Sequence, residues 1–113
     1  MSQLEAHCLT LVLEALACTL VITITRWAPT LRRWLLVCAC ASLLTHPFAW
    51  WANHALPWPP WPRVAVIEGI VVATEALIYW RLAPTSALRG LMMSVMANGA
   101  SFGLGLVILL WLW

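Results

Sequence analysis

Long apolar runs, separated by short polar or proline-containing breaks, make up almost the whole chain. Four of these runs are long enough to cross the hydrocarbon core of a bilayer, about 30 Å thick, as α-helices. We place the four helices at residues 4–25, 31–51, 64–82 and 88–111. The first and third breaks are so short that neighbouring helices should form antiparallel hairpins. The pattern therefore predicts an all-α membrane protein, with four transmembrane helices in an antiparallel bundle that forms one domain over residues 1–113.

The composition agrees with this pattern and leaves no stretch for a soluble domain. Hydrophobic residues make up 64% of the 113 residues and charged residues only 9%, and the mean hydropathy is +0.91. A soluble domain carries roughly a quarter charged residues. The first apolar run contains Glu5, His7 and Glu14 and lacks a basic start, so we expect a retained helix rather than a cleaved signal peptide.

The arginines predict the orientation in the membrane. The first and third connections are flanked by Arg26, Arg32, Arg33, Arg81 and Arg89. The second connection carries only Arg63. The positive-inside rule then places the first and third connections in the cytoplasm and both termini outside. We expect a multi-pass protein of the bacterial inner membrane. The arginines are accounted for by the orientation of the helices in the membrane, and the formal net charge is only +2. We therefore expect no nucleic-acid partner.

The tryptophans are expected to mark the two membrane interfaces. The predicted inner interface contains Trp27, Trp34 and Trp80, and the outer one contains Trp50, Trp51, Trp58, Trp61, Trp111 and Trp113. The second connection, residues 53–62, alternates tryptophan and proline, and its prolines predict a non-helical segment. We interpret this loop as a stiff, extended cap along the outer interface. The alternative is a proline-rich recognition ligand.

Two glutamates near the centres of their helices are the main candidates for function. Glu14 lies in the frame Leu-Glu-Ala-Leu and Glu75 in the matching frame Thr-Glu-Ala-Leu. A carboxylate at the centre of a bilayer costs about 3 kcal/mol or more unless it is partnered or protonated. The two glutamates therefore predict a buried polar site. The alternative is a proton-sharing pair that only fixes the register of the helices.

Polar spacing also indicates an internal repeat of a two-helix hairpin. His7 and Glu14 are seven residues apart, as are Glu68 and Glu75, and two helical turns place each pair on one face. The second and fourth predicted helices match more weakly. Such a repeat would be a parallel duplication about an axis along the membrane normal. Chance similarity between short apolar sequences is the alternative.

Depth in the bilayer groups the polar side chains into one predicted site. The predicted buried polar site consists of Glu14, Glu75, Asn98, Ser42, Thr45 and Ser101. The predicted outer entrance consists of His7, His46 and Glu68. Polar groups in lipid need partners, so we expect all four helices to turn these faces inward. The result would be a polar wedge that opens outside and closes toward the cytoplasm.

Simpler roles remain open for several of these residues. The serine and threonine hydroxyls can bond carbonyls of their own helix, and Asn98 can join two helices without any ligand. His46 precedes Pro47 and can bond the carbonyl that the proline leaves free. His7 and Glu68 are shallow enough to be solvated.

Metal binding and catalysis have less support. The candidate metal ligands are His46, Glu68 and Glu75, which are suitable by residue type. No H-E-x-x-H motif and no Ser/His/Asp spacing is present, so we predict no catalytic residue, and an enzyme is the less favoured interpretation. The sequence identifies no cofactor and no particular metal. The four cysteines contain no C-x-x-C motif, so we expect buried apolar packing rather than redox chemistry.

Small residues in the fourth predicted helix form a stripe that includes Gly99, Gly103 and Gly105. Such stripes allow helices to approach closely. Packing within the chain and homodimerisation are the two alternatives for this stripe.

Three strings of the chain resemble a group of small four-helix bacterial inner-membrane proteins. They are SLLTHPFAW at residues 42–50, EGIVVATEALIY at residues 68–79 and NGASFGLG at residues 98–105. That group carries no assigned function, so the resemblance implies only the fold. Small multidrug resistance exporters are similar in length and helix number, and Glu14 would match their proton-exchanging glutamate. The chain departs from them in its acidic third helix, its arginine bias and the absence of their third-helix tryptophan and glycine frame.

These observations favour an integral membrane protein that binds or transports a small cation, a metal ion or protons. The alternative is a non-catalytic subunit or assembly factor of a larger membrane complex, with the tryptophan-rich cap and the small-residue stripe as docking surfaces. An intramembrane enzyme and a small multidrug exporter are further alternatives. The expected partners are the lipid bilayer and either a second copy of the chain or a larger membrane complex.

Overall fold

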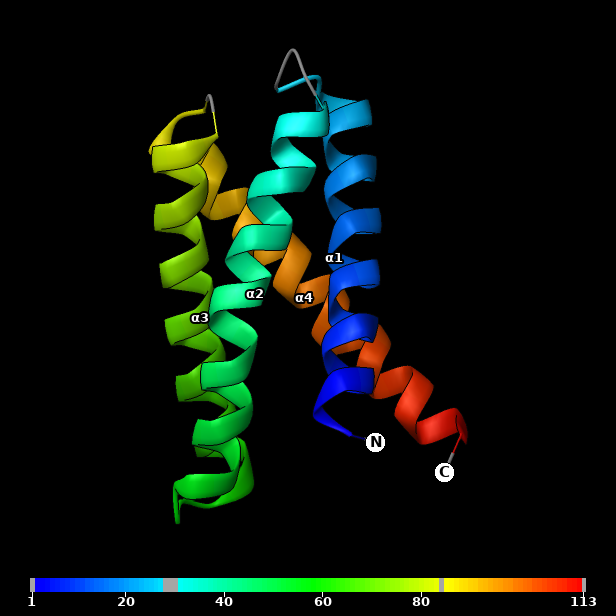
Figure 1. Cartoon of the computed structure of the whole chain (residues 1–113), viewed down its shortest axis with the longest axis vertical. Coiled ribbons are helices and arrows are strands. Elements are labelled where there is room, and N and C mark those ends of the chain that lie inside the picture. Colours follow the sequence, from blue (N-terminus) through cyan, green and yellow to red (C-terminus); the bar gives the residue numbers. More distant parts are fainter. Residues whose placement is uncertain (1, 28–30, 84, 113) are drawn as a thin grey trace.

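The computed structural model describes residues 2–27, 31–83 and 85–112, which form four α-helices (Figure 1). The helices are α1 (Gln3–Thr25), α2 (Leu31–Ala55), α3 (Pro60–Leu82) and α4 (Ala87–Leu112). Within the described residues, α1, α2 and the Ala87–Ile108 part of α4 are long and apolar enough to cross a membrane. The all-helical fold that the sequence predicts is confirmed at this level.

The helices alternate in direction along the long axis of the molecule (Figure 1). α2 and α4 each pack against both α1 and α3, so α1 and α3 lie diagonally opposite each other, as do α2 and α4. Both termini and the connection between α2 and α3, residues 56–59, lie at one end, which we call the open end. The connections that follow α1 and α3 lie at the other end, which we call the closed end.

The ends of α1 follow from local sequence. Ser2 caps the helix, because its side chain accepts from the backbone N–H of Glu5 while the Glu5 carboxylate accepts from the Ser2 backbone N–H at 2.7 Å. At the other end, Arg26 has a left-handed backbone, with φ of 54°, and its N–H donates to the Ile22 carbonyl. This conformation ends the helix in the way that a terminal left-handed residue commonly does.

The proline-rich connection is shorter than the sequence predicts. Helix α2 continues through Ala55 and α3 begins at Pro60, so only residues 56–59 are non-helical, in place of the predicted 53–62. The extended cap over that whole range is therefore wrong. Prolines are tolerated in the first turn of α3 because the first N–H groups of a helix have no acceptor within the helix.

Arg63 holds this short connection in place. Its Nε donates to Asn53 Oδ1 at 3.0 Å, and its Nη1 donates to the carbonyls of Leu56 and Trp58 at 3.1 and 3.3 Å. The guanidinium has several donors in a fixed fork, so a single side chain can satisfy carbonyls that neither helix reaches. The one arginine at the open end is therefore used in the turn between α2 and α3.

A packed apolar core fills the closed end. Its buried members are Cys18, Ile22, Trp34, Val37, Cys38, Ala41, Tyr79, Ala83 and Met93. The rings of Trp34 and Tyr79 lie 5.6 Å apart and come from α2 and α3. Trp34 has no exposed surface, so its ring does not face lipid, and its depth at the inner interface stays a prediction. Its large apolar ring is buried against neighbouring helices instead.

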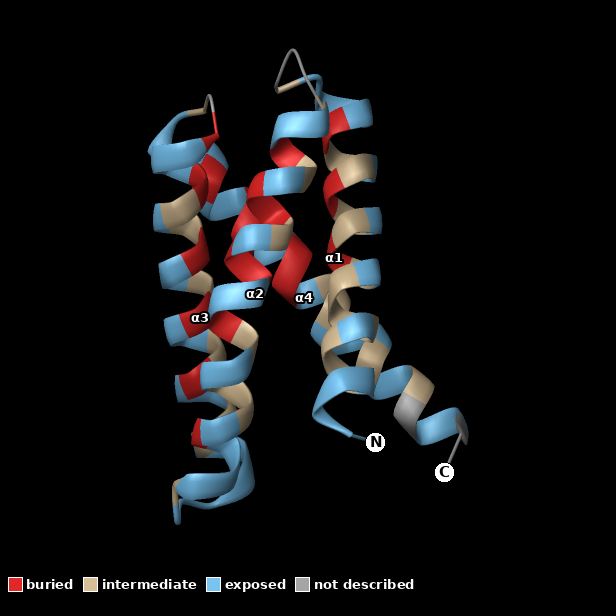
Figure 2. Cartoon of the chain, in the orientation of Figure 1, coloured by how far each residue is buried: buried red, intermediate tan, exposed pale blue. Residues whose placement is uncertain are grey.

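Burial is distributed unevenly along the molecule (Figure 2). Among the described residues, α1 buries nothing before Glu14 and α4 buries nothing after Asn98. At the open end, α2 and α3 still share a small core of Ala52, Ile67 and Val71. The open-end halves of α1 and α4 therefore lack the packed contacts that fill the closed end.

The glycines of α4 explain part of this difference. A Cβ at Gly90 would lie 3.1 Å from the Ala76 carbonyl oxygen, so this glycine permits close contact between α4 and α3. A Cβ at Gly99, Gly103 or Gly105 would meet nothing within 4 Å. Close packing within the chain, one of the two alternatives for this stripe, is therefore not seen at these three glycines, because α4 crosses away from α3 toward α1 (Figure 1). Homodimerisation through them remains a prediction.

The cysteines divide into two classes. Cys18 and Cys38 are buried in the closed-end core, as expected for apolar packing, whereas Cys8 and Cys40 are exposed on the outer surface of the bundle. For Cys8 and Cys40 the predicted buried role is wrong, because each lies on the side of its helix that faces away from the neighbouring helices.

Candidate functional site

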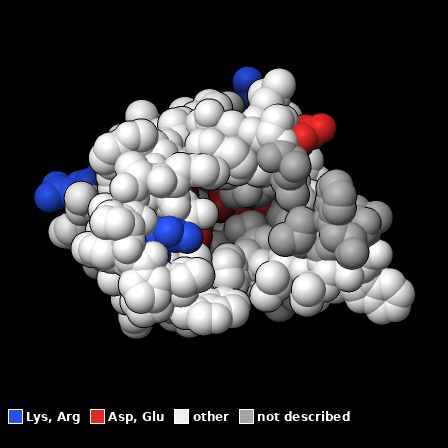
Figure 3. Space-filling model, turned by 90° about the horizontal axis from the view of Figure 1, so that it is seen from below, with Lys and Arg blue, Asp and Glu red and all other residues white. Residues whose placement is uncertain are grey.

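A cavity of about 370 Å³ lies among the open-end halves of all four helices. Every residue of the predicted buried polar site lines this cavity, as do His46 and Glu68 of the predicted entrance. Viewed from the open end, the molecule shows acidic side chains recessed within an opening (Figure 3). The cavity arises because the apolar core at the closed end does not continue between the diverging helices.

Glu75 is the best-bonded side chain of the cavity. It projects from α3 and is 1% exposed. Its Oε1 lies 2.6 Å from the Thr45 hydroxyl of α2, and its Oε2 accepts from Asn98 Nδ2 of α4, also at 2.6 Å. A buried carboxyl with both oxygens bonded avoids the penalty of an unpaired polar group. Glu75 therefore joins three helices at one point.

The Thr45 hydroxyl can serve Glu75 in either protonation state. Its Oγ1 also lies 3.0 Å from the carbonyl oxygen of Ala41, one turn earlier in α2. A hydroxyl has one proton but two acceptor lone pairs. When Glu75 is ionised, Thr45 donates to it. When Glu75 carries a proton on Oε1, it donates to Thr45, which then donates to Ala41. Thr45 is thus also close enough to bond a carbonyl of its own helix, which is the simpler role that the sequence allows for it.

Asn98 is fixed by a second polar residue that the sequence analysis missed. The Asn98 Nδ2 group also donates to the Ser94 carbonyl at 2.9 Å, and the Ser94 hydroxyl donates to the Val72 carbonyl of α3 at 2.7 Å. Ser94 stands four residues before Asn98, so helical spacing was a signal that could have found it. Ser101 bonds the Asn98 carbonyl within α4 at 3.1 Å, one of the simpler roles left open.

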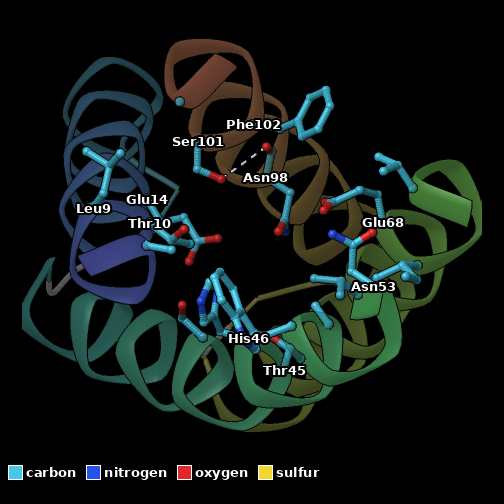
Figure 4. A pocket seen from close by; sticks show the side chains of 18 of the residues that line it. Leu9, Thr10, Glu14, Thr45, His46, Asn53, Glu68, Asn98, Ser101 and Phe102 are labelled. Carbon is cyan, nitrogen blue, oxygen red and sulfur yellow. Dashed lines mark hydrogen bonds between the residues drawn. The ribbon is translucent and has the colours of Figure 1, made fainter. Parts of the chain in front are cut away.

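Glu14 reaches the same cavity from the opposite side but has fewer partners. It is 1% exposed, and its Oε2 has no hydrogen-bond partner among the described residues. Ser42 Oγ also lines the cavity and also lacks a partner there. Figure 4 shows Glu14 projecting from α1 toward the middle of the cavity, with Thr10 beside it. Thr10 is a second missed residue, one turn before Glu14.

The two entrance histidines lie together. The rings of His7 and His46 stack at 4.4 Å with 20° between their planes, which joins α1 to α2. Nε2 of each ring has no hydrogen-bond partner among the described residues, so the structure shows no bond from His46 Nε2 to a carbonyl freed by Pro47. His46 is among the residues that line the cavity, whereas His7 is not.

The cavity contains three carboxyls but neither arginine nor lysine. Glu14, Glu68 and Glu75 line it, and the one titratable basic side chain among its lining residues is the imidazole of His46. The chain has no lysine, and the nearest arginine at this end, Arg63, is bonded in the turn after α2. Carboxylates that share a low-dielectric site cannot all ionise without a compensating cation. The cavity therefore holds either protons or a bound cation on these groups.

The candidate metal ligands are not assembled into a metal centre. Among the described residues, no three histidine, cysteine, aspartate or glutamate side chains come together in a group that could hold a metal ion. His46 comes from α2, whereas Glu68 and Glu75 come from one face of α3, two helical turns apart. The geometry therefore does not support the metal set drawn from residue types, because the three side chains are not gathered around one point.

Comparison of the chain with known protein families, with curated proteins and with solved structures finds no match.

Proposed function

We propose that this chain binds a small cation at Glu14 and Glu75 in exchange for protons and carries it across a bacterial inner membrane. The observation that carries this proposal is the group of three carboxyls in one cavity that is lined by no arginine or lysine. A resident arginine or lysine would neutralise such a site permanently. Without one, protons and an exogenous cation compete for the same charge.

The proposal treats all four helices as membrane spans in an antiparallel bundle. We take α3 as a span with the others because both of its glutamates line the cavity, where protons or polar partners can offset their cost in the membrane. Five of the six arginines lie at the closed end, which the positive-inside rule places in the cytoplasm. The open end and both termini then face outside. The diagonal placement of Glu14 and Glu75 suits a duplicated hairpin.

The bonding around Glu75 supports exchange rather than a fixed structural role. Thr45 can donate to the ionised carboxyl or accept from the protonated one, so the bond between Thr45 and Glu75 persists in both protonation states. Glu14 lines the same cavity, and one of its carboxyl oxygens has no hydrogen-bond partner among the described residues. For each monovalent cation that binds, one proton leaves one of these carboxyls, and the charge of the cavity is unchanged.

The test uses the full chain reconstituted in liposomes with an internal pH-sensitive dye. An imposed cation gradient should drive proton movement in the wild type. Glu75→Gln and Glu14→Gln should lower that rate by about 100-fold, because an amide resembles a protonated acid but cannot release the proton. Glu5→Gln is the matched control, since Glu5 is exposed, lies outside the cavity and keeps its capping role as glutamine.

Two results would contradict the proposal. One is wild-type rates in the Glu14→Gln and Glu75→Gln variants. The other is an equal loss in Glu5→Gln, which would point to a general effect of removing acidic residues. Circular dichroism of each variant should show unchanged helicity, so that loss of transport is not loss of folding.

A non-catalytic subunit of a larger membrane complex is the second candidate. The observation that favours it is the uncovered face of α4, where a Cβ at Gly99 or Gly103 would meet nothing within 4 Å. Purification in mild detergent from native membranes tests this directly. A stoichiometric partner protein that is lost in Gly103→Leu would support a subunit, whereas a homogeneous single-chain species with transport activity would exclude one.

A further inference from the structure

A groove of about 400 Å³ runs along the outside of the bundle between α3 and α4. It forms because α4 lies close to α3 at Gly90 and then crosses away from it toward the open end (Figure 1). Val72 of α3 and Val95 of α4 line the groove, together with Gly99, which leaves its wall without a side chain. In the proposed membrane arrangement, this face of the helices is covered by lipid acyl chains.

The groove and the cavity are neighbours that share part of their lining. Val64, Glu68, Asn98 and Phe102 line both spaces. Figure 4 shows Glu68 from α3 and Phe102 from α4 on either side of the gap between these two helices. Side chains alone therefore separate the lipid-facing groove from the cavity. Glu68 is a carboxyl that can be reached from either space.

The walls of the cavity suit an organic cation better than an inorganic one. Leu9, Ile67 and Val71 line it with apolar surface, and Trp50 and Phe102 contribute aromatic rings. Apolar walls stabilise apolar substituents, and aromatic faces attract quaternary ammonium groups. A metal ion requires several ligand atoms around one point, and the described residues do not gather them. The volume of about 370 Å³ also exceeds what a bare ion fills.

We propose that the exchanged cation is an amphiphilic organic ammonium ion that reaches the cavity sideways from the lipid, through the groove between α3 and α4. This inference rests on the proposed exchange function and names the substrate class and route for the same site. Glu68 meets the ammonium first, at the boundary of groove and cavity. Glu14 and Glu75 then hold it while one proton leaves a carboxyl.

The first experiment measures substrate class. The full chain is placed in phosphatidylcholine nanodiscs in weak buffer, and proton release is followed with a pH indicator. The added cations are tetramethylammonium, butyltrimethylammonium and octyltrimethylammonium, with Na⁺ and Zn²⁺ as inorganic alternatives. Proton release should reach half its maximum at an octyl concentration at least about tenfold below that of the methyl compound, because the alkyl chain contributes apolar burial. The Glu14→Gln/Glu75→Gln double variant should release no protons.

The second experiment measures the route. Gly99→Leu places a side chain in the groove and should slow proton release by octyltrimethylammonium about tenfold, with half-saturation changed less, since access limits the rate. Gly103→Leu is the matched control. It makes the same substitution on the same helix, and a Cβ at Gly103 also meets nothing within 4 Å. Gly103 lines neither the groove nor the cavity. It should stay within about twofold of the wild-type rate. Val95→Phe fills the same groove from the preceding turn and repeats the test if Gly99→Leu fails to fold.

Each remaining outcome overturns part of the argument in a distinguishable way. Proton release by Na⁺ or Zn²⁺ but not by the ammonium series would overturn the substrate class and leave the exchange function standing. Release by no cation would remove the exchange function itself. Wild-type rates in both Gly99→Leu and Val95→Phe, or equal slowing in Gly103→Leu, would overturn the route.

Discussion

The two ends of this molecule are built from the same four helices but packed in different ways. At the closed end, Trp34, Tyr79 and Met93 fill the space between helices with side chains that are completely buried. At the open end, the same helices surround a cavity lined by Glu14 and Glu75. Apolar residues at the closed end gain from burial, whereas the carboxyls need polar neighbours or a cation. Packed apolar side chains therefore fill the closed end, and the candidate site lies at the open end.

The closed end is not free of polar groups. The indole Nε1 of Trp34 and the hydroxyl of Tyr79 are buried there without a hydrogen-bond partner among the described residues. Each unpaired group costs free energy that the surrounding apolar contacts must offset. In the proposed transport cycle this end must open to the cytoplasm, and both groups would then gain partners. The proposed transport would thus require the well-packed end to open.

The largest effect should come from emptying the closed-end core. Trp34→Ala removes a completely buried ring and should lower the free energy of unfolding by about 3–5 kcal/mol. Trp58→Ala, in the connection at the open end, should change it by about 1 kcal/mol or less, since Trp58 is largely exposed. Unfolding in mixed micelles of increasing denaturing-detergent fraction measures both values. Equal losses would show that the two ends are not packed differently.

A smaller effect should separate two glycines of α4. Gly90→Leu must push a side chain into the Ala76 carbonyl and the Trp80 backbone, and should cost about 2 kcal/mol or more. Gly103→Leu enters open space and should cost about 0.5 kcal/mol or less. The same detergent titration compares the pair. A large loss in Gly103→Leu would instead indicate that another chain covers this face.

The smallest effect should come from the polar bonds of the cavity. Asn98→Ala removes the donor to Glu75 Oε2 and should cost about 1–3 kcal/mol, because a buried acceptor loses its partner. Ser101→Ala removes a bond within one helix turn and should cost about 0.5 kcal/mol. Thermal unfolding of the purified variants provides the comparison. Equal costs would mean that Asn98 does not bridge α3 and α4 in the protein.

Helical periodicity was sufficient to place many of the candidate residues correctly relative to one another. The seven-residue spacing of Glu68 and Glu75 puts both on one face, and both line the cavity. Ser94 lies four residues before Asn98, and Thr10 lies four residues before Glu14. Helical periodicity therefore also places these two hydroxyls beside the site. The non-helical segment was predicted too long because proline, which disrupts the interior of a helix, is tolerated in its first turn. Helix α3 begins at Pro60 for this reason.

The sequence by itself determined the four helices, because apolar runs of bilayer length and their breaks are local properties of the chain. It also determined that Glu14 and Glu75 need a buried polar environment. The tertiary structure alone decided which atoms meet: that Thr45 and Asn98 bond Glu75, and that Glu14 keeps an unpaired oxygen. The crossing of α4, close at Gly90 and open at Gly99, decided where the cavity and the groove lie. Contacts between helices depend on side chains from distant parts of the chain packing together, and no local pattern specifies that packing.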